Sequence, residues 1–160
     1  MKIGIIVYSK TGNTLQAAER IAARLTKAGE QVEIQRFTAE EESAQSSRPV
    51  RLHKTPNPNL YDALIIGSPV KAFSLDPAMT MYLQQVEFTK QVPTFCFLTQ
   101  YFKKPWMGGN HAMKQLLSQL RAKSVAAQSL GIVNWSNAKR EAQIDAIAEQ
   151  SENMIQGIIK

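Results

Sequence analysis

The chain contains few of the residues on which several classes of protein depend. Its 160 residues include a single cysteine, Cys96, and only two histidines. One cysteine excludes a disulfide framework and a thiolate metal cluster, and a lone thiol suits a reducing cytoplasm. Because Cys96 lies within an apolar segment, we expect it to be an inert part of the core.

Long apolar runs are missing too. The N-terminal run ends at Tyr8, which is far too early to cross a membrane, and the sequence there has no signal-peptide pattern. We therefore expect a cytoplasmic protein without membrane insertion. With 44% hydrophobic and 20% charged residues, the chain is predicted to fold as one domain spanning residues 1–160.

Acidic residues are in the minority. The chain has 13 aspartates and glutamates against 19 lysines and arginines, which gives a formal net charge of +6. Such an excess favours an anionic ligand or partner. Basic residues form no dense block and do not alternate with aromatic residues, so we expect no nucleic acid partner. The carboxylates are scattered without metal-ligand spacing, so no metal site is predicted.

The apolar pattern predicts strands that alternate with helices. Five strands are predicted, at residues 2–8, 31–37, 61–67, 92–99 and 124–133. Apolar residues at three- and four-residue spacing predict helices that begin near Thr14, Pro77, Asn110 and Asn137. This alternation predicts an α/β fold with a doubly wound, five-stranded parallel sheet and helices on both faces.

Residues 38–59 interrupt this alternation. They are polar and contain three prolines. We predict a long loop here, with at most a turn or two of helix at residues 40–45.

Residues 9–14, SKTGNT, follow the first predicted strand directly and lead into a helix. In an open parallel sheet, ligands bind at the carboxyl ends of the strands. Unpaired N–H groups and the positive dipole end of a helix N-terminus favour an anion there. We expect phosphate contacts from this segment, from Ser9, Lys10, Thr11, Gly12, Asn13 and Thr14. The alternative is a plain helix cap at Ser9 or Asn13. A triphosphate loop would end in Gly-Lys-Ser/Thr, so a terminal monophosphate fits better.

Three segments together resemble the flavodoxin family. SKTGNT is similar to the family's phosphate loop, Thr/Ser-x-Thr-Gly-x-Thr. LIIGSPVKAFSL (64–75) resembles its first flavin loop, and FLTQYFKKPWMGGN (97–110) resembles its second. The resemblance covers essentially the whole chain. It implies the strand order 2-1-3-4-5, non-covalent binding of FMN, and electron transfer.

The residues after the third and fourth predicted strands suit the flavin ring that this resemblance implies. An isoalloxazine needs backbone hydrogen-bonding groups at its edge and apolar or aromatic cover on its faces. The first flavin loop is predicted to contribute Ser68, Pro69, Val70, Lys71, Ala72 and Phe73. The second is predicted to contribute Thr99, Gln100, Tyr101, Phe102, Trp106, Gly108 and Gly109. The alternatives are that a given aromatic belongs to the core or surface, and that Gly108 and Gly109 form a plain turn.

The charge of the chain departs from the flavodoxin pattern. Electron-carrier flavodoxins are acidic around the flavin, whereas four lysines lie in or beside the loops here, at Lys10, Lys71, Lys103 and Lys104. Positive charge near the ring stabilises a reduced, anionic flavin, so we hypothesise a less negative reduction potential. The alternative is that the lysines point into screened solvent. A basic rim favours an acidic protein partner or a phosphate-bearing substrate.

Other proteins with a related sheet lack support. A receiver domain needs aspartate after the third strand and acidic residues after the first, where this chain has Gly67-Ser68 and Tyr8-Ser9. A low-molecular-weight phosphatase needs a cysteine at the start of the first loop, and residues 9–14 of this chain contain none. Three functions remain open: an FMN-dependent electron carrier with a redox partner protein, an FMN-dependent NAD(P)H oxidoreductase acting on quinones or similar acceptors, and a non-enzymatic FMN- or partner-binding module. The sequence predicts no catalytic acid–base residue and does not indicate the oligomeric state.

Overall fold

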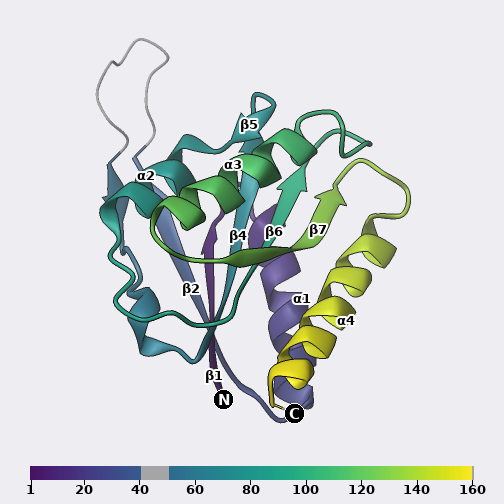
Figure 1. Ribbon diagram of the computed structural model, residues 1–160. Coiled ribbons are helices and arrows are strands. Elements are labelled where there is room, and N and C mark those ends of the chain that lie inside the picture. Colours follow the sequence, from purple (N-terminus) through teal and green to yellow (C-terminus); the bar gives the residue numbers. More distant parts are fainter. Residues whose placement is uncertain (41–50, 160) are drawn as a thin grey trace.

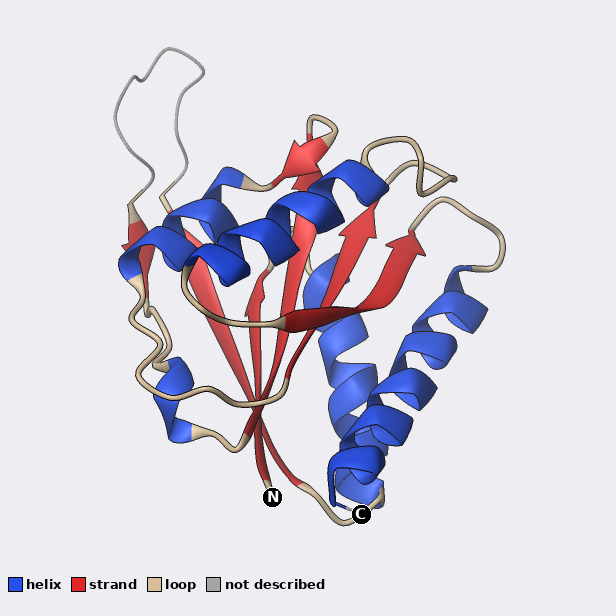
Figure 2. Cartoon of the chain, in the orientation of Figure 1, coloured by secondary structure: helices blue, strands red, loops and turns tan. Residues whose placement is uncertain are grey.

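The computed structural model describes residues 1–40 and 51–159. A central sheet carries helices on both faces (Figure 1). One face is covered by α2 (Pro77–Gln85) and α3 (Gly109–Ala122), and the other by α1 (Asn13–Lys27) and α4 (Arg140–Ile159). Figure 2 shows the same three layers by element type.

In the described residues, the sheet consists of five long strands and two short ones. The long strands run parallel in the order β2 (Gln31–Ala39), β1 (Lys2–Tyr8), β4 (Ala63–Lys71), β6 (Thr94–Gln100) and β7 (Ala127–Asn134). Two antiparallel strands are added, β3 (Leu52–His53) beside β2 and β5 (Ser74–Leu75) beside the end of β4. The predicted α/β fold, with a mostly parallel sheet and helices on both faces, is confirmed. The predicted five-stranded, wholly parallel sheet in the order 2-1-3-4-5 is wrong as stated, because within the described residues the two short antiparallel strands make it a mixed sheet of seven.

Both short strands lie in segments that were predicted as loops. The described part of residues 38–59 contains the end of β2, the whole of β3 and the first two residues of a short 3-10 helix, Pro58–Leu60. Strands of two residues are too short for an apolar period to reveal them. The helical turn predicted at residues 40–45 lies, beyond Glu40, outside the described residues.

The core has one half on each face of the sheet, because successive residues of a strand point to opposite sides. Ile5 of β1 packs with Ile21 of α1 and Ile147 of α4. Ile6, the next residue, packs in the cluster formed with α2 and α3. Cys96 is fully buried in that same cluster, as expected, and burial raises the pKa of its thiol. Within residues 1–40 and 51–159, no helix is both long and apolar enough to cross a membrane.

Candidate functional site

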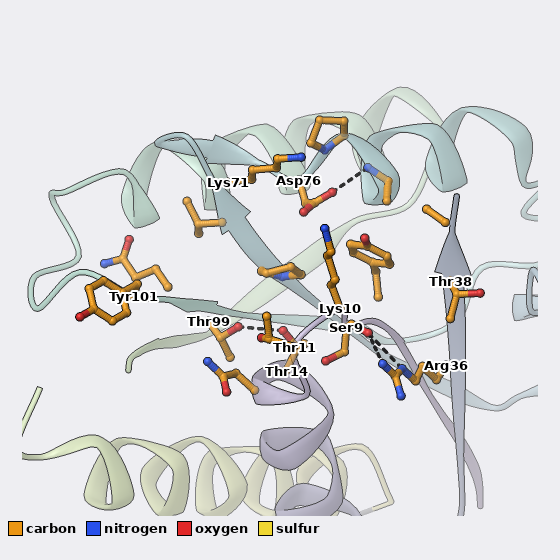
Figure 3. Close-up of a pocket in the computed structure, with 18 of the residues that line it drawn as sticks. Ser9, Lys10, Thr11, Thr14, Arg36, Thr38, Lys71, Asp76, Thr99 and Tyr101 are labelled. Carbon is orange, nitrogen blue, oxygen red and sulfur yellow. Dashed lines mark hydrogen bonds between the residues drawn. The ribbon is translucent and has the colours of Figure 1, made fainter. Parts of the chain in front are cut away.

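A cavity of about 530 Å³ opens at the carboxyl ends of β1, β4 and β6 (Figure 3). Its walls come from the segment after β1, the ends of β2 and β4, the start of α2, and the end of β6. Its volume lies within the range of sites for small organic ligands. The chain leaves β1 toward β2 on one side and β4 lies on the other, so the cavity is at the point where the winding direction switches.

Ser9 shapes the loop on the floor of the cavity. It is 2% exposed, and its hydroxyl accepts hydrogen bonds from the amides of Gly12 and Leu15, each at 3.2 Å. Gly12 has a φ of 97°, a left-handed conformation that favours glycine, and α1 begins directly after it. The Ser9 hydroxyl oxygen thus acts as a helix cap, because both of its acceptor bonds are made to amides of the loop and of the first turn of α1.

The first residues of α1 complete the floor. Asn13 and Thr14 line the cavity. Their backbone N–H groups have no acceptor within the helix, and they lie at the positive end of its dipole. Lys10 and Thr11 line the cavity beside them. The loop therefore offers an anion several donors and a cation, in addition to the capping bond of Ser9.

Arg36 of β2 is a site residue that the sequence analysis missed. Its guanidinium donates to the carbonyl oxygen of Ser9, from Nε at 3.0 Å and also from Nη2 (Figure 3). It fixes the first peptide of the loop and adds a positive charge to the cavity wall. An alternating strand predicts its polar residues to face solvent, so the pattern gave no signal for this contact.

Two buried threonines tie the loop to β6. The hydroxyl oxygens of Thr14 and Thr99 lie 2.7 Å apart and form a hydrogen bond. The two residues are 1% and 2% exposed. Both also line the cavity (Figure 3). This hydrogen bond joins residues 9–14 to the end of β6.

The segment after the third predicted strand is a β-hairpin instead of an open loop. β4 continues to Lys71 and β5 pairs back on it, with Ala72 and Phe73 at the tip at φ values of 50° and 65°. Pro69, Val70 and Lys71 line the cavity.

Ser68 and the hairpin tip do not line the cavity. Ser68 is fully buried and its hydroxyl donates to the Pro69 carbonyl at 3.0 Å. Ala72 and Phe73 lie at the tip, outside the lining. The predicted ring contacts of this segment therefore divide into three residues at the cavity and three away from it.

The third segment divides in the same way. Thr99, Gln100 and Tyr101 line the cavity. Phe102 stacks on Phe73, with ring centroids 5.1 Å apart. The other predicted residues lie outside the lining: Trp106 and Gly108 border a separate groove, and Gly109 is the first residue of α3.

Comparisons with known proteins gave matches at the level of structure alone. The sequence matches no family model and no curated protein. Among solved structures, a flavodoxin from Streptococcus pneumonia TIGR4 superimposes with a TM-score of 0.67 at 15% identity, over 98% of this chain and 99% of that one. The chain has a flavodoxin-like fold.

Other proteins that share the flavodoxin-like fold differ in function. An azoreductase from Bacillus anthracis str. Sterne has a TM-score of 0.62 at 11% identity, over 96% of this chain and 98% of that one. A flavoprotein from Lactobacillus acidophilus NCFM in complex with FMN has a TM-score of 0.56 at 14% identity, over 90% of this chain and 96% of that one. Sequence identities this low support a shared fold only, so the function has to be argued from the residues of the site.

Asp76 is a buried carboxylate in a cavity that is also lined by Glu40 and by three basic residues, Lys10, Arg36 and Lys71. It caps α2 by accepting a hydrogen bond from the Ala78 amide at 2.9 Å. Burial raises the pKa of Asp76, while the Ala78 hydrogen bond and the charges of Lys71 and Lys10 act to lower it. Figure 3 shows both lysines extending toward it. Among the described residues, no group of three or more His, Cys, Asp or Glu is placed to hold a metal ion.

The raised pKa of Asp76 predicts a pH-dependent stability. A carboxyl whose pKa is higher in the folded state contributes stability that is fully present below its unfolded pKa and is lost as pH rises through the folded value. Asp76→Asn keeps a capping side chain and does not titrate. We expect the free energy of unfolding of Asp76→Asn, relative to wild type, to rise between about pH 3 and pH 7 in urea titrations. A difference that shrinks with pH would contradict this assignment.

The Thr14–Thr99 bond gives a second prediction, with a matched control on the same strand. Thr99 and Thr94 lie near opposite ends of β6, and each is 2% exposed. The Thr99 hydroxyl bonds to that of Thr14, and the Thr94 hydroxyl donates to the Val92 carbonyl. Valine at either position removes a hydrogen bond of about 1 kcal/mol. We expect Thr99→Val to weaken FMN binding by about fivefold or more in fluorescence titrations, because it releases the N-terminal end of α1, where the sequence analysis expects the phosphate. Thr94→Val is expected to leave FMN affinity unchanged, and equal losses in both variants would refute a local role for Thr99.

Proposed function

We propose that this chain is a flavodoxin-like protein that binds FMN non-covalently and transfers electrons through it, with residues 1–160 forming one FMN-binding domain. The observation that carries the proposal is the loop of residues 9–14 on the floor of a ligand-sized cavity, at the switch point of the sheet.

The residues at the cavity fit the parts of FMN. The terminal phosphate is assigned to the amides of Asn13 and Thr14 and to the hydroxyl of Thr11, with Lys10 and Arg36 supplying positive charge. The ring is assigned to the wall formed by residues 69–71 and Tyr101, which combines backbone groups with one aromatic side chain. FMN, when bound, supplies the redox chemistry. The chain binds the cofactor, orients it and sets the charge around it.

An FMN-dependent NAD(P)H oxidoreductase is the second candidate. It is favoured by the structural similarity to an azoreductase and by the exposure of Tyr101, which is 74% accessible at the edge of the cavity. An open ring edge leaves room for a small substrate. Electron transfer to a protein partner stands first, because three segments of the chain resemble the phosphate loop and the two flavin loops of the flavodoxin family.

Anaerobic reduction of the FMN-loaded protein separates the candidates. We expect the yellow colour to persist with NADH or NADPH alone and to bleach when NADPH is added together with a reductase whose docking surface is acidic. Direct bleaching by NAD(P)H would instead identify the oxidoreductase. Stable FMN binding without bleaching under either condition would exclude both redox functions and favour a non-enzymatic FMN-binding module.

A further inference from the structure

Four aromatic side chains form a patch on the surface beside the cavity. Phe73, Tyr101, Phe102 and Trp106 are 55%, 74%, 36% and 73% exposed. They account for four of the seven large hydrophobic residues exposed in the described part of the chain. Phe102 stacks on Phe73 at 5.1 Å and meets Tyr101 edge-on at 6.3 Å, so these three side chains are contiguous. Trp106 lines the same groove as Phe73. We call these four residues the aromatic patch.

A groove of about 410 Å³ continues the patch. Phe73 and Trp106 line it together with Met107, Gly108 and His111. Its lining is mostly apolar, and it lies outside the larger cavity that we assign to FMN. Aromatic residues and methionine of this kind are enriched at the centres of protein–protein interfaces.

The backbone holds Phe73 in its exposed position at an energetic cost. Ala72 and Phe73 both have positive φ, which is costly for residues with a Cβ and is usually met by Asn-Gly in a two-residue hairpin turn. Gly108 lies directly against this turn, since a Cβ there would be 2.7 Å from the Cα of Phe73. The strained turn does not bury Phe73 in the core. It fixes the side chain at the surface, which indicates that the exposed ring is itself useful.

The charge around the aromatic patch is positive. The two segments that carry the patch, residues 71–75 and 101–111, contain three lysines and no aspartate or glutamate. Lys71 precedes the hairpin tip, and Lys103 and Lys104 lie between Phe102 and Trp106 in the chain; all three are exposed. A second copy of the chain would bring these lysines face to face and be repelled, whereas an acidic surface would be attracted.

We propose that the aromatic patch docks an acidic protein, which inserts an apolar side chain into the groove between Phe73 and Trp106. Because the patch borders the proposed flavin cavity, its occupant is the redox partner, and this part of the inference rests on the proposed function. Nucleic acid is the weaker occupant, because the basic residues of the chain form no dense block for a phosphate backbone, and one face of Phe73 and one of Phe102 are already used in their mutual stacking.

The test is chemical-shift mapping of the full-length, isotopically labelled protein with two haem proteins of opposite charge. Acidic cytochrome b5 is expected to shift amide signals of residues 71–75 and 101–111 at low salt, and the shifts are expected to vanish in high salt. Basic cytochrome c is expected to shift none of them. Shifts elsewhere on the surface, no shifts with cytochrome b5, or equal shifts with both would overturn the proposal.

Matched variants separate docking from net charge. Trp106→Ala and Lys104→Glu are each expected to weaken cytochrome b5 binding about fivefold or more. The controls are Leu60→Ala, at a site 56% exposed on the 3-10 helix, and Lys27→Glu, at the end of α1. Both are expected to change binding by less than about twofold, because neither lies on the patch. Equal weakening by variant and control would contradict the assignment.

Two further probes complete the test. Oligothymidylate or phosphatidylserine vesicles that bind the patch more tightly than cytochrome b5 would overturn the choice of a protein partner. The mapping is run with and without FMN. Shifts by cytochrome b5 in a protein that binds no FMN would leave the docking surface standing and refute the proposed function, so the two failures can be told apart.

Discussion

Replacing Gly12 with alanine is expected to weaken FMN binding at least about tenfold. Gly12 has a φ of 97° and lies between Ser9 and the first turn of α1. A side chain there is strained by about 1–2 kcal/mol, although no atom lies within 4 Å of the new Cβ. The loop relaxes by turning its amides, and those amides are the groups that we assign to the phosphate. Isothermal calorimetry with FMN measures the loss.

Gly29, at the other end of α1, provides the control for Gly12. It has the same φ of 97°, and a Cβ there also has nothing within 4 Å. Alanine at either position is expected to lower the free energy of unfolding by a similar amount, about 1 kcal/mol. FMN affinity is expected to fall in Gly12→Ala and to stay unchanged in Gly29→Ala. If both variants bound FMN as tightly as wild type, the loop would not hold the cofactor.

Reversing the charge of Lys71 is expected to lower the midpoint potential of bound FMN by about 40 mV. Lys71 lines the cavity next to the residues that we assign to the ring. Its positive charge favours the electron-rich, reduced cofactor, and Lys71→Glu replaces that attraction with repulsion. The effect is modest because Lys71 is exposed and its charge is screened by solvent. A spectroelectrochemical titration measures the potential.

Lys27→Glu makes the same change in net charge far from the cavity. Lys27 is an exposed residue in the last turn of α1, whereas the cavity lies at the first turn. We expect its potential to match that of wild type within about 10 mV at physiological salt, because the Debye length there is about 8 Å. A shift of equal size in both variants would mean that net charge, and not the position of Lys71, sets the potential.

Local sequence patterns predicted much of the framework of the site. The apolar run at residues 2–8 is β1, and the three- and four-residue spacing after Thr14 is α1. These elements depend on periodicity, which a single sequence displays. Their junction therefore located the 9–14 loop, and the structure brings it together with Thr99 and Tyr101 at one cavity. These residues stay a proposed cofactor site until FMN binding is measured.

The features that the sequence did not reveal are those set by tertiary contact. Arg36 lies at a polar position of β2, and only the packing of β2 beside β1 brings its guanidinium to the Ser9 carbonyl. The hairpin tip at Ala72 and Phe73 lacks the Asn-Gly pair by which a sequence usually reveals a two-residue turn. The tip packs against Gly108, which comes from a distant segment, and a single sequence does not show such a contact. Phe102 and Trp106 were predicted to contact the flavin ring because they follow the fourth predicted strand closely in the sequence. In the folded chain they lie in the aromatic patch instead.

The most direct test of the account compares FMN with riboflavin, which lacks the phosphate, by calorimetry on the same protein. If the 9–14 loop holds the terminal phosphate, FMN binds about 100-fold more tightly or better, because two or more charge-assisted hydrogen bonds are lost with riboflavin. Equal affinities for the two flavins, or no heat with FMN in a protein that remains folded, would contradict the account.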